Sequence, residues 1–489
     1  MNTPASDAAG QIPKAEQLPV RLKVMHGFGS IAYGVKENGF STFLLLFYNQ
    51  VAGIDAGLVG TAIMVALIAD AFIDPVIGEL SDRTQTRWGR RLPWLYGAPV
   101  PLALAWLALW HPPEGSDAIV IAWLVGWAIV VRSLVSMCEV PSIALVPELT
   151  ADYDERTILM RYRFLFGWAG GLLILILAYA VFFRQGGETD ATGYVAYSSA
   201  GAILMAGAVL LSAVGQHRRI ARPSPPRKAQ QGGIAAILRE MKHTLSNRAF
   251  LWLVFAALFG FINQGISFSL TNYLIGFLWL FDQGEKTAYA VMLFGTMIAA
   301  FIIVAPLARW LGKREAAIIS GLASLAFNTL LYLLYYFDLF PMIGNKPSVA
   351  VMFGIVFLSN TFAIALMVLS SSMMADVVEA SQSETGRRSE GLFFAGYFFM
   401  QKCATGIGIF VAGQILSWAL FPRSAKPGEV AGPVLDNVAL GYVFSILVIG
   451  SVGLLVMRRF PIDRADHESR LAKLDAEARA DPDGTRILP

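Results

Sequence analysis

Charge is scarce in this chain: only 15% of its 489 residues are Asp, Glu, Lys or Arg, whereas 56% are hydrophobic. Soluble domains carry about 25% charged residues, so the composition indicates a protein that crosses a membrane many times. The two cysteines, Cys138 and Cys403, have no metal or disulfide spacing, and the five histidines fall at span ends, in loops or in the tail. No Walker phosphate loop is present. These absences exclude ATP as the energy source and argue against an enzyme; no cofactor and no nucleic-acid partner is expected.

Twelve apolar runs are long enough to cross a bilayer as helices, which takes about 20 residues. They cover residues 26–50, 57–80, 93–110, 118–147, 158–183, 193–215, 248–281, 288–310, 315–337, 348–375, 391–421 and 437–459. The polar N-terminal segment has no apolar core, so we expect no cleavable signal peptide. The pattern predicts an all-α membrane protein with twelve spans.

The basic residues lie mostly on one side of this map. Of the 38 Lys and Arg residues, 29 fall in the N-terminus, the even-numbered connections or the C-terminal tail, or in the adjoining ends of spans. The odd-numbered connections hold only Arg184, Lys286, Lys346, Arg423 and Lys426. Because positive residues stay in the cytoplasm, both termini are predicted to be cytoplasmic, and we expect the protein in the bacterial inner membrane.

The longest connection, residues 216–247, divides the spans into six and six. It is basic and Pro-rich, and its second part is typical of an amphipathic helix on the inner membrane face. RTQTRWGRR, between spans 2 and 3, is echoed by ARWLGKRE between spans 8 and 9. Two pseudo-symmetric bundles around a central site are therefore predicted. The expected order is a tail at 1–25, a six-helix bundle at 26–215, the linker at 216–247, a second bundle at 248–459 and a tail at 460–489.

Two carboxylates lie deep inside span 57–80. Asp70 is 12 residues from Asp82 at the polar end of the span, or roughly 18 Å at a helical rise of 1.5 Å per residue. Asp74 lies one helical turn further on, so both carboxylates share a face. Lys402 lies at the same depth in span 391–421. Ionisable groups at such depth usually mark the path of an ion or a solute.

Three segments resemble one known family. LSDRTQTRWGRRLPW (80–94), VPELTADYDERT (146–157) and ADVVEASQSETGRRSEGLFFA (375–395) are similar to signature loops of the glycoside–pentoside–hexuronide:cation symporters. That family is the melibiose-permease branch of the major facilitator superfamily. The resemblance runs from about His26 to Arg459, and it implies alternating access with a cation moving beside a sugar-like solute. Eukaryotic lysolipid symporters share the branch, so a lysolipid or another amphiphile is the alternative solute.

The resemblance also implies a cation-coupling site. The family forms this site from acids of span 2 and a lysine of span 11, which match Asp70, Asp74 and Lys402. Ser136 stands where the family has a hydroxyl group. Asp70 and Asp74 are thus the expected ligands of a sodium ion or acceptors of a proton, and Lys402 is expected to replace the cation when none is bound. Ile73 stands in place of an amide ligand, which weakens the match to sodium because hard cations need several oxygens.

Glu139 and Arg163 match the acidic and basic sugar-site positions of the family, on spans 4 and 5. Two other positions depart from the family pattern. Gly34 stands where the family has an acid, and Ile143 stands where the family has an aromatic ring that stacks on the sugar. The resemblance therefore implies a sugar-like site without galactoside specificity. For Arg163, a side chain that extends to the membrane surface is the alternative.

The sequence offers five further candidates for binding the solute. They are Lys36, Glu37, Arg132, Asn263 and Tyr273. The two cations would suit a solute carboxylate or phosphate, or they would pair internally with Glu37 and Glu139. The two polar residues of span 7 either face a cavity or join membrane helices.

A third set of charges flanks the spans on the predicted cytoplasmic side. It consists of Asp82, Arg83, Arg90, Arg91, Asp154, Arg156, Arg387 and Arg388. We expect these residues to form a latch, with opposite charges pairing when this face closes and separating when it opens. A channel would need a ring of repeated pore residues, usually from several subunits, and the sequence suggests none. The expected protein is a monomer with a small-molecule solute and the lipid bilayer as partners.

Overall fold

The computed structural model describes residues 18–150, 152–221, 247–341, 343, 345–385 and 390–461, and its regular elements there are helices. Most of the predicted N-terminal tail, the amphipathic segment of the linker and nearly all of the C-terminal tail lie outside these ranges. Below, the N-terminal bundle means residues 18–221 and the C-terminal bundle means residues 247–461. The predicted boundary between them stays a prediction.

Ten helices within the described residues are long and apolar enough to cross a membrane. They are α4 (Ala56–Arg83), α7 (Asp117–Ala144), α9 (Tyr153–Leu177), α10 (Ala191–Ile220), α12 (Arg248–Tyr273), α13 (Gln283–Leu311), α14 (Lys313–Tyr336), α15 (Lys346–Thr385), α16 (Glu390–Trp418) and α17 (Gly432–Met457). Short elements extend three of them: α8 (Val146–Leu149), η3 (Ala178–Phe182) and η4 (Leu274–Leu278). Each of the ten coincides with one predicted span.

The first and third predicted spans are interrupted helices. The first span consists of α1 (Val20–Phe28), α2 (Ile31–Asn38), the π-helical turn η1 (Gly39–Phe43), α3 (Leu44–Leu46) and the π-helical turn η2 (Phe47–Val51). The third span consists of α5 (Leu92–Gly97) and α6 (Pro99–Leu109). The break before α6 falls at Pro99, which has no N–H to continue the helix. Twelve spanning helices therefore stay a prediction for these two segments.

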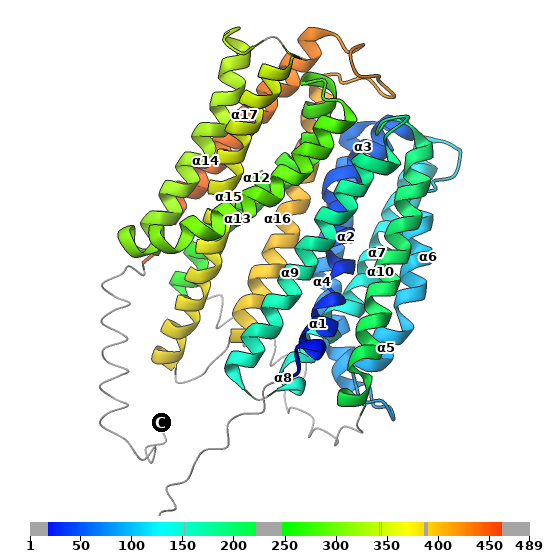
Figure 1. The fold of residues 1–489 in the computed structure, drawn as a ribbon, viewed down its shortest axis with the longest axis vertical. Helices are drawn as coiled ribbons and strands as arrows, with labels where there is room; N and C mark the ends of the chain where they lie inside the picture. The colour runs from blue at the N-terminus through cyan, green and yellow to red at the C-terminus, as the bar shows by residue number, and fades with distance from the viewer. Residues whose placement is uncertain are drawn as a thin grey trace, which may run out of the picture.

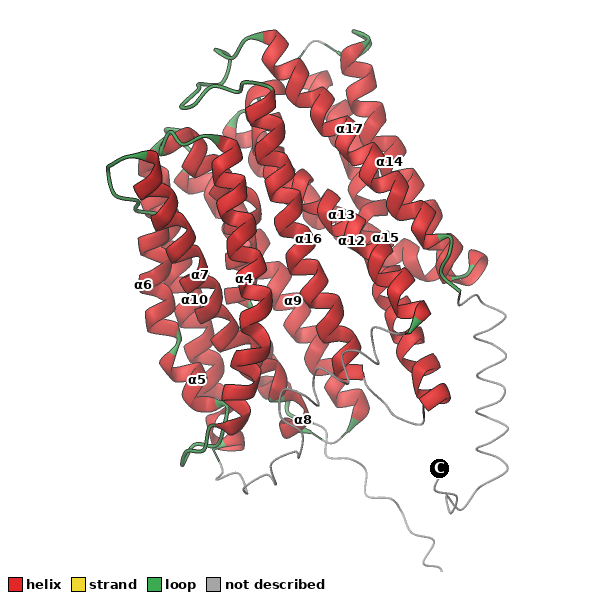
Figure 2. Cartoon of the chain, turned by 180° about the vertical axis from the view of Figure 1, so that it is seen from behind, coloured by secondary structure: helices red, strands yellow, loops and turns green. Residues whose placement is uncertain are grey.

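The helices of each bundle pack mainly on one another (Figure 1). In the N-terminal bundle, α4 packs on α7, and α9 packs on α1 and α2. In the C-terminal bundle, α12 packs on α16 and α17, and α14 packs on α15. The largest contact between the bundles joins α4 to α16, which lie side by side in Figure 2. A site carried by these two helices is therefore shared by both bundles.

Glycines allow the closest helix crossings. A Cβ atom at Gly34 of α2 would lie 1.9 Å from the carbonyl oxygen of Gly167 in α9. At the contact between the bundles, a Cβ at Gly60 of α4 would lie 3.2 Å from the Cα of Gly413 in α16. The family's acid at the position of Gly34 therefore has no room here, because the backbone of α9 occupies the space.

We expect Gly34→Ala to destabilise the protein. The new methyl group would meet backbone atoms that cannot rotate away, and overpacking of this kind costs about 1–3 kcal/mol. A lower apparent melting temperature of the detergent-purified variant would show this. Gly207→Ala in α10 is the matched control, because a Cβ there meets no atom within 4 Å. Equal melting temperatures for the two variants would contradict the packing described here.

Candidate functional site

The predicted cation-coupling residues form one cluster between the bundles. Lys402 Nζ of α16 lies 2.8 Å from Asp70 Oδ2 and 2.5 Å from Asp74 Oδ2, both on α4. Arg132 of α7 holds Asp70 from the other side, with Nε at 2.9 Å and Nη2 at 2.8 Å from Oδ2. Ser136 Oγ lies 2.6 Å from Asp74 Oδ1 and 3.1 Å from Asp70 Oδ1. Two acids and two bases therefore balance each other.

Helical spacing explains the shape of this cluster. Asp70 and Asp74 are one turn apart on α4, and Arg132 and Ser136 are one turn apart on α7. Where the two helices pack, Arg132 therefore contacts Asp70, and one turn further on Ser136 contacts Asp74. The side chains of Asp70 and Arg132 are only 2% and 1% exposed. The side chain of Asp74 is 29% exposed and that of Lys402 is 16% exposed. The cluster is therefore sealed at Asp70 and accessible at Asp74.

Arg132 has a different partner from the one expected. The sequence placed it with Glu139 or with the solute, since the two residues lie on one face of α7. Instead, Asp70 from α4 accepts both of its hydrogen bonds, and its guanidinium carbon lies 5.1 Å from the centre of the Phe40 ring. Arg132 is not among the residues that line the pocket described next. Its contacts therefore place Arg132 beside Asp70 in the cation cluster, and a role in solute binding stays a prediction.

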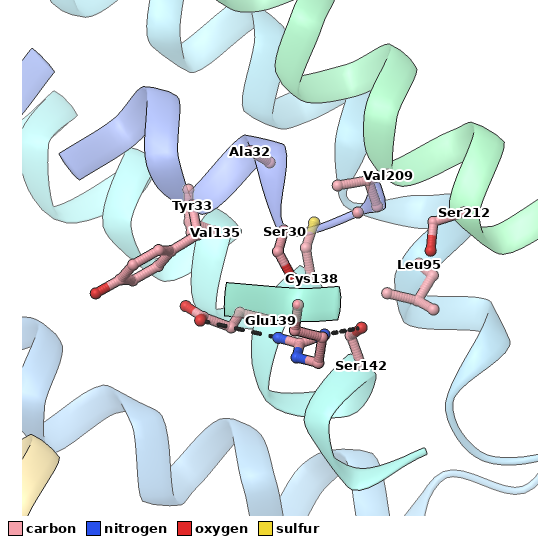
Figure 3. A pocket seen from close by; sticks show the side chains of 12 residues that line it. Ser30, Ala32, Tyr33, Leu95, Val135, Cys138, Glu139, Ser142, Val209 and Ser212 are labelled. Atoms are coloured by element: carbon pink, nitrogen blue, oxygen red, sulfur yellow. Dashed lines mark hydrogen bonds and ion pairs between the residues drawn. The ribbon is translucent and has the colours of Figure 1, made fainter. Parts of the chain in front are cut away.

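A pocket in the N-terminal bundle contains both predicted sugar-site residues (Figure 3). Arg163 Nη1 donates to Ser142 Oγ at 2.6 Å, and Nη2 lies 4.0 Å from Glu139 Oε1. The Arg163 side chain is only 6% exposed, whereas that of Glu139 is 24% exposed. Arg163 thus points into the bundle, which contradicts the alternative that it extends to the membrane surface. The pocket is further lined by Gly29, Ser30, Ala32, Tyr33, Leu95, Val135, Cys138, Val209 and Ser212.

Lys36 and Glu37 form an ion pair with each other. The Lys36 side chain is 2% exposed and its Nζ lies 4.4 Å from the centre of the Tyr33 ring. This geometry favours the predicted internal pairing of Lys36 over a direct contact with a solute. Glu37, with a third of its side chain exposed, is the accessible member of the pair.

The structure places Asn263 and Tyr273 away from the pocket. Asn263 Nδ2 donates to the Ile446 carbonyl of α17 at 3.1 Å and so joins two helices of one bundle. The hydroxyl of Tyr273 donates to Asn49 Oδ1 at 2.9 Å and so joins the two bundles. These contacts favour helix packing, the alternative interpretation of polar residues in span 7, and a role as solute ligands stays a prediction.

Polar contacts join the bundles at the end opposite Arg83, which we call the outer end. Lys286 Nζ of α13 lies 2.7 Å from Glu188 Oε2 in the loop before α10, and both side chains are buried. Asn272 of α12 donates to the Thr42 carbonyl at 2.9 Å and accepts from the Tyr179 hydroxyl at 2.5 Å. The sequence pattern did not indicate this set. Lys286 was marked only as one of the few basic residues in the odd-numbered connections.

The predicted latch residues pair inside the N-terminal bundle. Arg91 binds Asp82 and donates to Ser81 Oγ at 2.6 Å. Arg90 Nη2 lies 2.9 Å from Glu148 Oε1, a partner that the latch hypothesis did not include. Arg91 Nε also lies 3.6 Å from Glu148 Oε1, Arg83 pairs with Glu79, and Arg156 donates to the Thr150 carbonyl. These contacts connect the end of α4 to α8 and the start of α9. The pairing of these charges across the cytoplasmic face when that face closes stays a prediction. The side chains of Asp154, Arg387 and Arg388 lie outside the described part.

Comparison with known proteins agrees with this geometry. Residues 25–464 match the family model described as MFS/sugar transport protein. A putative glycoside/cation symporter of Escherichia coli strain K12 is 25% identical over 96% of this chain and 98% of its own length. The sodium-dependent lysophosphatidylcholine symporter 1 of Gallus gallus is 21% identical over 95% of this chain and 91% of its own length. The structure of the E. coli xylose transporter in an inward-open conformation superposes with a TM-score of 0.63 at 16% identity, covering 93% of this chain and 99% of that one.

The family match spans both bundles, the cation cluster and the pocket, and the similar structure shares the arrangement of helices. The predicted resemblance to glycoside–pentoside–hexuronide:cation symporters is confirmed by the family model and by the named symporter relative. The chain is thus an integral membrane transporter and not an enzyme, and it belongs to the MFS/sugar transport protein family of the major facilitator superfamily.

Proposed function

We propose that this chain is a cation-coupled symporter that carries a sugar, glycoside or hexuronide across the bacterial inner membrane by alternating access. One observation carries the proposal: Glu139 of the pocket lies three residues after Ser136 of the cation cluster, and both residues belong to α7. Solute and cation would therefore act on the same helix. Sodium and a proton are the two candidate ions.

The pocket chemistry suits a polyhydroxylated solute. Sugar hydroxyls donate and accept hydrogen bonds, so the Glu139 carboxylate can accept and the Arg163 guanidinium can donate. A hexuronide would add a carboxylate that pairs with Arg163. The gap of 4.0 Å between Arg163 and Glu139 leaves both groups with hydrogen-bonding capacity for a solute. All lining residues come from the N-terminal bundle, so the other bundle would complete the site when the two approach.

Lys402 supplies the link between ion binding and bundle arrangement. It comes from the C-terminal bundle and neutralises acids of the N-terminal bundle. A cation that arrives at the accessible acid, Asp74, takes over that role and releases Lys402 and α16. Ion binding then changes the arrangement of the bundles, and the arrangement of the bundles changes the affinity for the ion to the same extent, as thermodynamic linkage requires.

The buried contacts at the outer end support an inward-facing state. The basic loops predict that the outer end faces away from the cytoplasm, and Glu188, Lys286, Tyr273 and Asn49 hold that end closed. Solute would then leave or enter on the cytoplasmic side in this arrangement. Opening the outer end requires these contacts to separate.

The solute class can be tested on the purified protein. Thermal stabilisation over a panel of hexosides, hexuronides and lysolipids should select the sugar-like compounds. A lysolipid is the alternative, because Arg163 would also bind a phosphate group. Stabilisation by lysolipids alone would replace the sugar proposal.

Replacing Glu139 or Arg163 with Gln should lower solute uptake by roughly 10- to 150-fold while leaving the amount of folded protein unchanged. Each change removes a charge that would strengthen a hydrogen bond to the solute, worth about 1.5–3 kcal/mol. Uptake into proteoliposomes measures the effect. Arg161→Gln, two residues away on α9 and exposed, is the matched control. Normal transport by the double Gln variant would refute the assignment of the site.

Asp74→Asn should remove the dependence of uptake on the ion gradient and leave downhill solute exchange intact. Without the carboxylate, Lys402 has only Asp70 to neutralise, so no cation is needed to release it. Counterflow and gradient-driven uptake in proteoliposomes separate the two activities. Glu79→Gln, on the same helix and exposed, should behave as wild type. If transport and stability fall together while the ion dependence remains, the cluster is only structural.

Glu188→Gln should shift the protein toward an outward-open state. The change leaves Lys286 buried without its partner while the outer end is closed, and an unpaired buried charge costs about 3–5 kcal/mol. Distances between spin labels across the outer end should lengthen. The exposed pair between Arg423 and Asp117 also joins the bundles, and breaking it should have little effect because exposed pairs contribute at most about 1 kcal/mol. Unchanged distances in Glu188→Gln would reject the outer contact as a closure.

A further inference from the structure

Arg132 already occupies the position of a cation at Asp70. Its Nε and Nη2 atoms both contact Asp70 Oδ2, and Lys402 Nζ reaches the same oxygen at 2.8 Å. One oxygen of this buried carboxylate thus receives three charge-assisted donors. Among the described residues, Ser136 Oγ donates to its other oxygen, at 3.1 Å.

The donor set does not fit a sodium ion. Hard cations take about six oxygens or more, whereas this cluster offers the two carboxylates and one hydroxyl, and both Oδ2 atoms are taken by bases. Even if a sodium ion displaced Lys402, Arg132 would still occupy Asp70 Oδ2, so the ion would find three carboxylate oxygens and the Ser136 hydroxyl in this cluster. Among the described residues, no group of three or more His, Cys, Asp or Glu side chains is placed to hold a metal.

The two bases differ in how easily they can leave. Lys402 belongs to the other bundle and is partly exposed, so it moves away when α16 moves. Arg132 belongs to the same bundle as Asp70, is 2% exposed, and stacks over Phe40. No motion between the bundles separates Arg132 from Asp70, and removing either partner would leave a buried charge unpaired.

We propose that Arg132 is a built-in cation that replaces sodium at Asp70 and thereby makes this transporter independent of sodium. The inference rests on the proposed cation-coupled function and deepens it, because sodium is the candidate ion that this cluster excludes. Only Asp74, with its single carboxylate and the Ser136 hydroxyl, remains for exchange with Lys402. Arg132 acts as a specificity residue through Asp70 and touches no solute.

Three forms of the purified full-length protein test the proposal. Wild type, Arg132→Gln and Arg132→Lys are titrated with sodium chloride against choline chloride at equal ionic strength, and the apparent melting temperature is recorded. Wild type and Arg132→Lys should show no difference between the two salts, because each keeps a cation beside Asp70. Arg132→Gln should show a saturable rise with sodium alone, since the change frees Asp70 and adds an amide oxygen.

A sodium-specific rise in the wild type would overturn the proposal, and so would a folded Arg132→Gln protein that ignores sodium. Should Arg132→Gln fail to fold, binding of radioactive sodium to the wild type decides the question: binding overturns the proposal and its absence supports it. These measurements need no solute. A failure of the sugar panel would therefore remove the proposed function without touching this result, and sodium binding beside intact sugar uptake would remove only the present inference.

Discussion

A charge inside a membrane protein must find its counter-charge nearby, and this constraint shapes the centre of the molecule. Asp70, almost completely buried, is neutralised by Arg132 of its own bundle and Lys402 of the other, both of which contact its Oδ2 atom. The desolvation of such groups is costly, and only close pairing with hydrogen bonds offsets it. The arrangement of α4, α7 and α16 follows from this requirement, since each helix must bring its charged residue to the same depth.

The same constraint separates fixed charges from exchangeable ones. Asp70 and Arg132 belong to one bundle and stay together whatever the other bundle does. Asp74 and Lys402 come from different bundles and are partly exposed, so their contact depends on how the bundles are placed. An ion pair across a moving interface connects local charge to global shape, and that is the property a coupled transporter needs. At the outer end, Glu188 and Lys286 repeat this design with a second buried pair.

The pocket around Glu139 and Arg163 differs from the cation cluster because its two charged groups are not tightly paired. Glu139 and Arg163 are 4.0 Å apart, and Glu139 keeps about a quarter of its side chain exposed. Charges that are close without pairing tightly retain hydrogen-bonding capacity, which a hydroxylated or anionic solute can use. The close approach of α2 and α9 at Gly34 leaves no room there for an acidic side chain. The chain therefore keeps the two charged positions of the family and lacks the acid that the family has at Gly34.

The sequence by itself determined the membrane class, ten of the spanning helices and the depth of Asp70, Asp74 and Lys402, because apolar runs and helical periodicity are local properties. It also placed Glu139 and Arg163, through the resemblance of their positions to a family. Only the tertiary structure decided the partner of Arg132. Helical spacing offered Glu139 on the same helix as one possible partner, with a solute as the other, but Arg132 contacts Asp70 of a neighbouring helix. Among the described latch residues, Arg83, Arg90, Arg91 and Arg156 likewise have partners within one bundle, and Glu188 of a loop contacts Lys286 in α13 of the other bundle. Such pairings depend on how helices are packed against one another, and that information is not contained in the periodicity of any single helix.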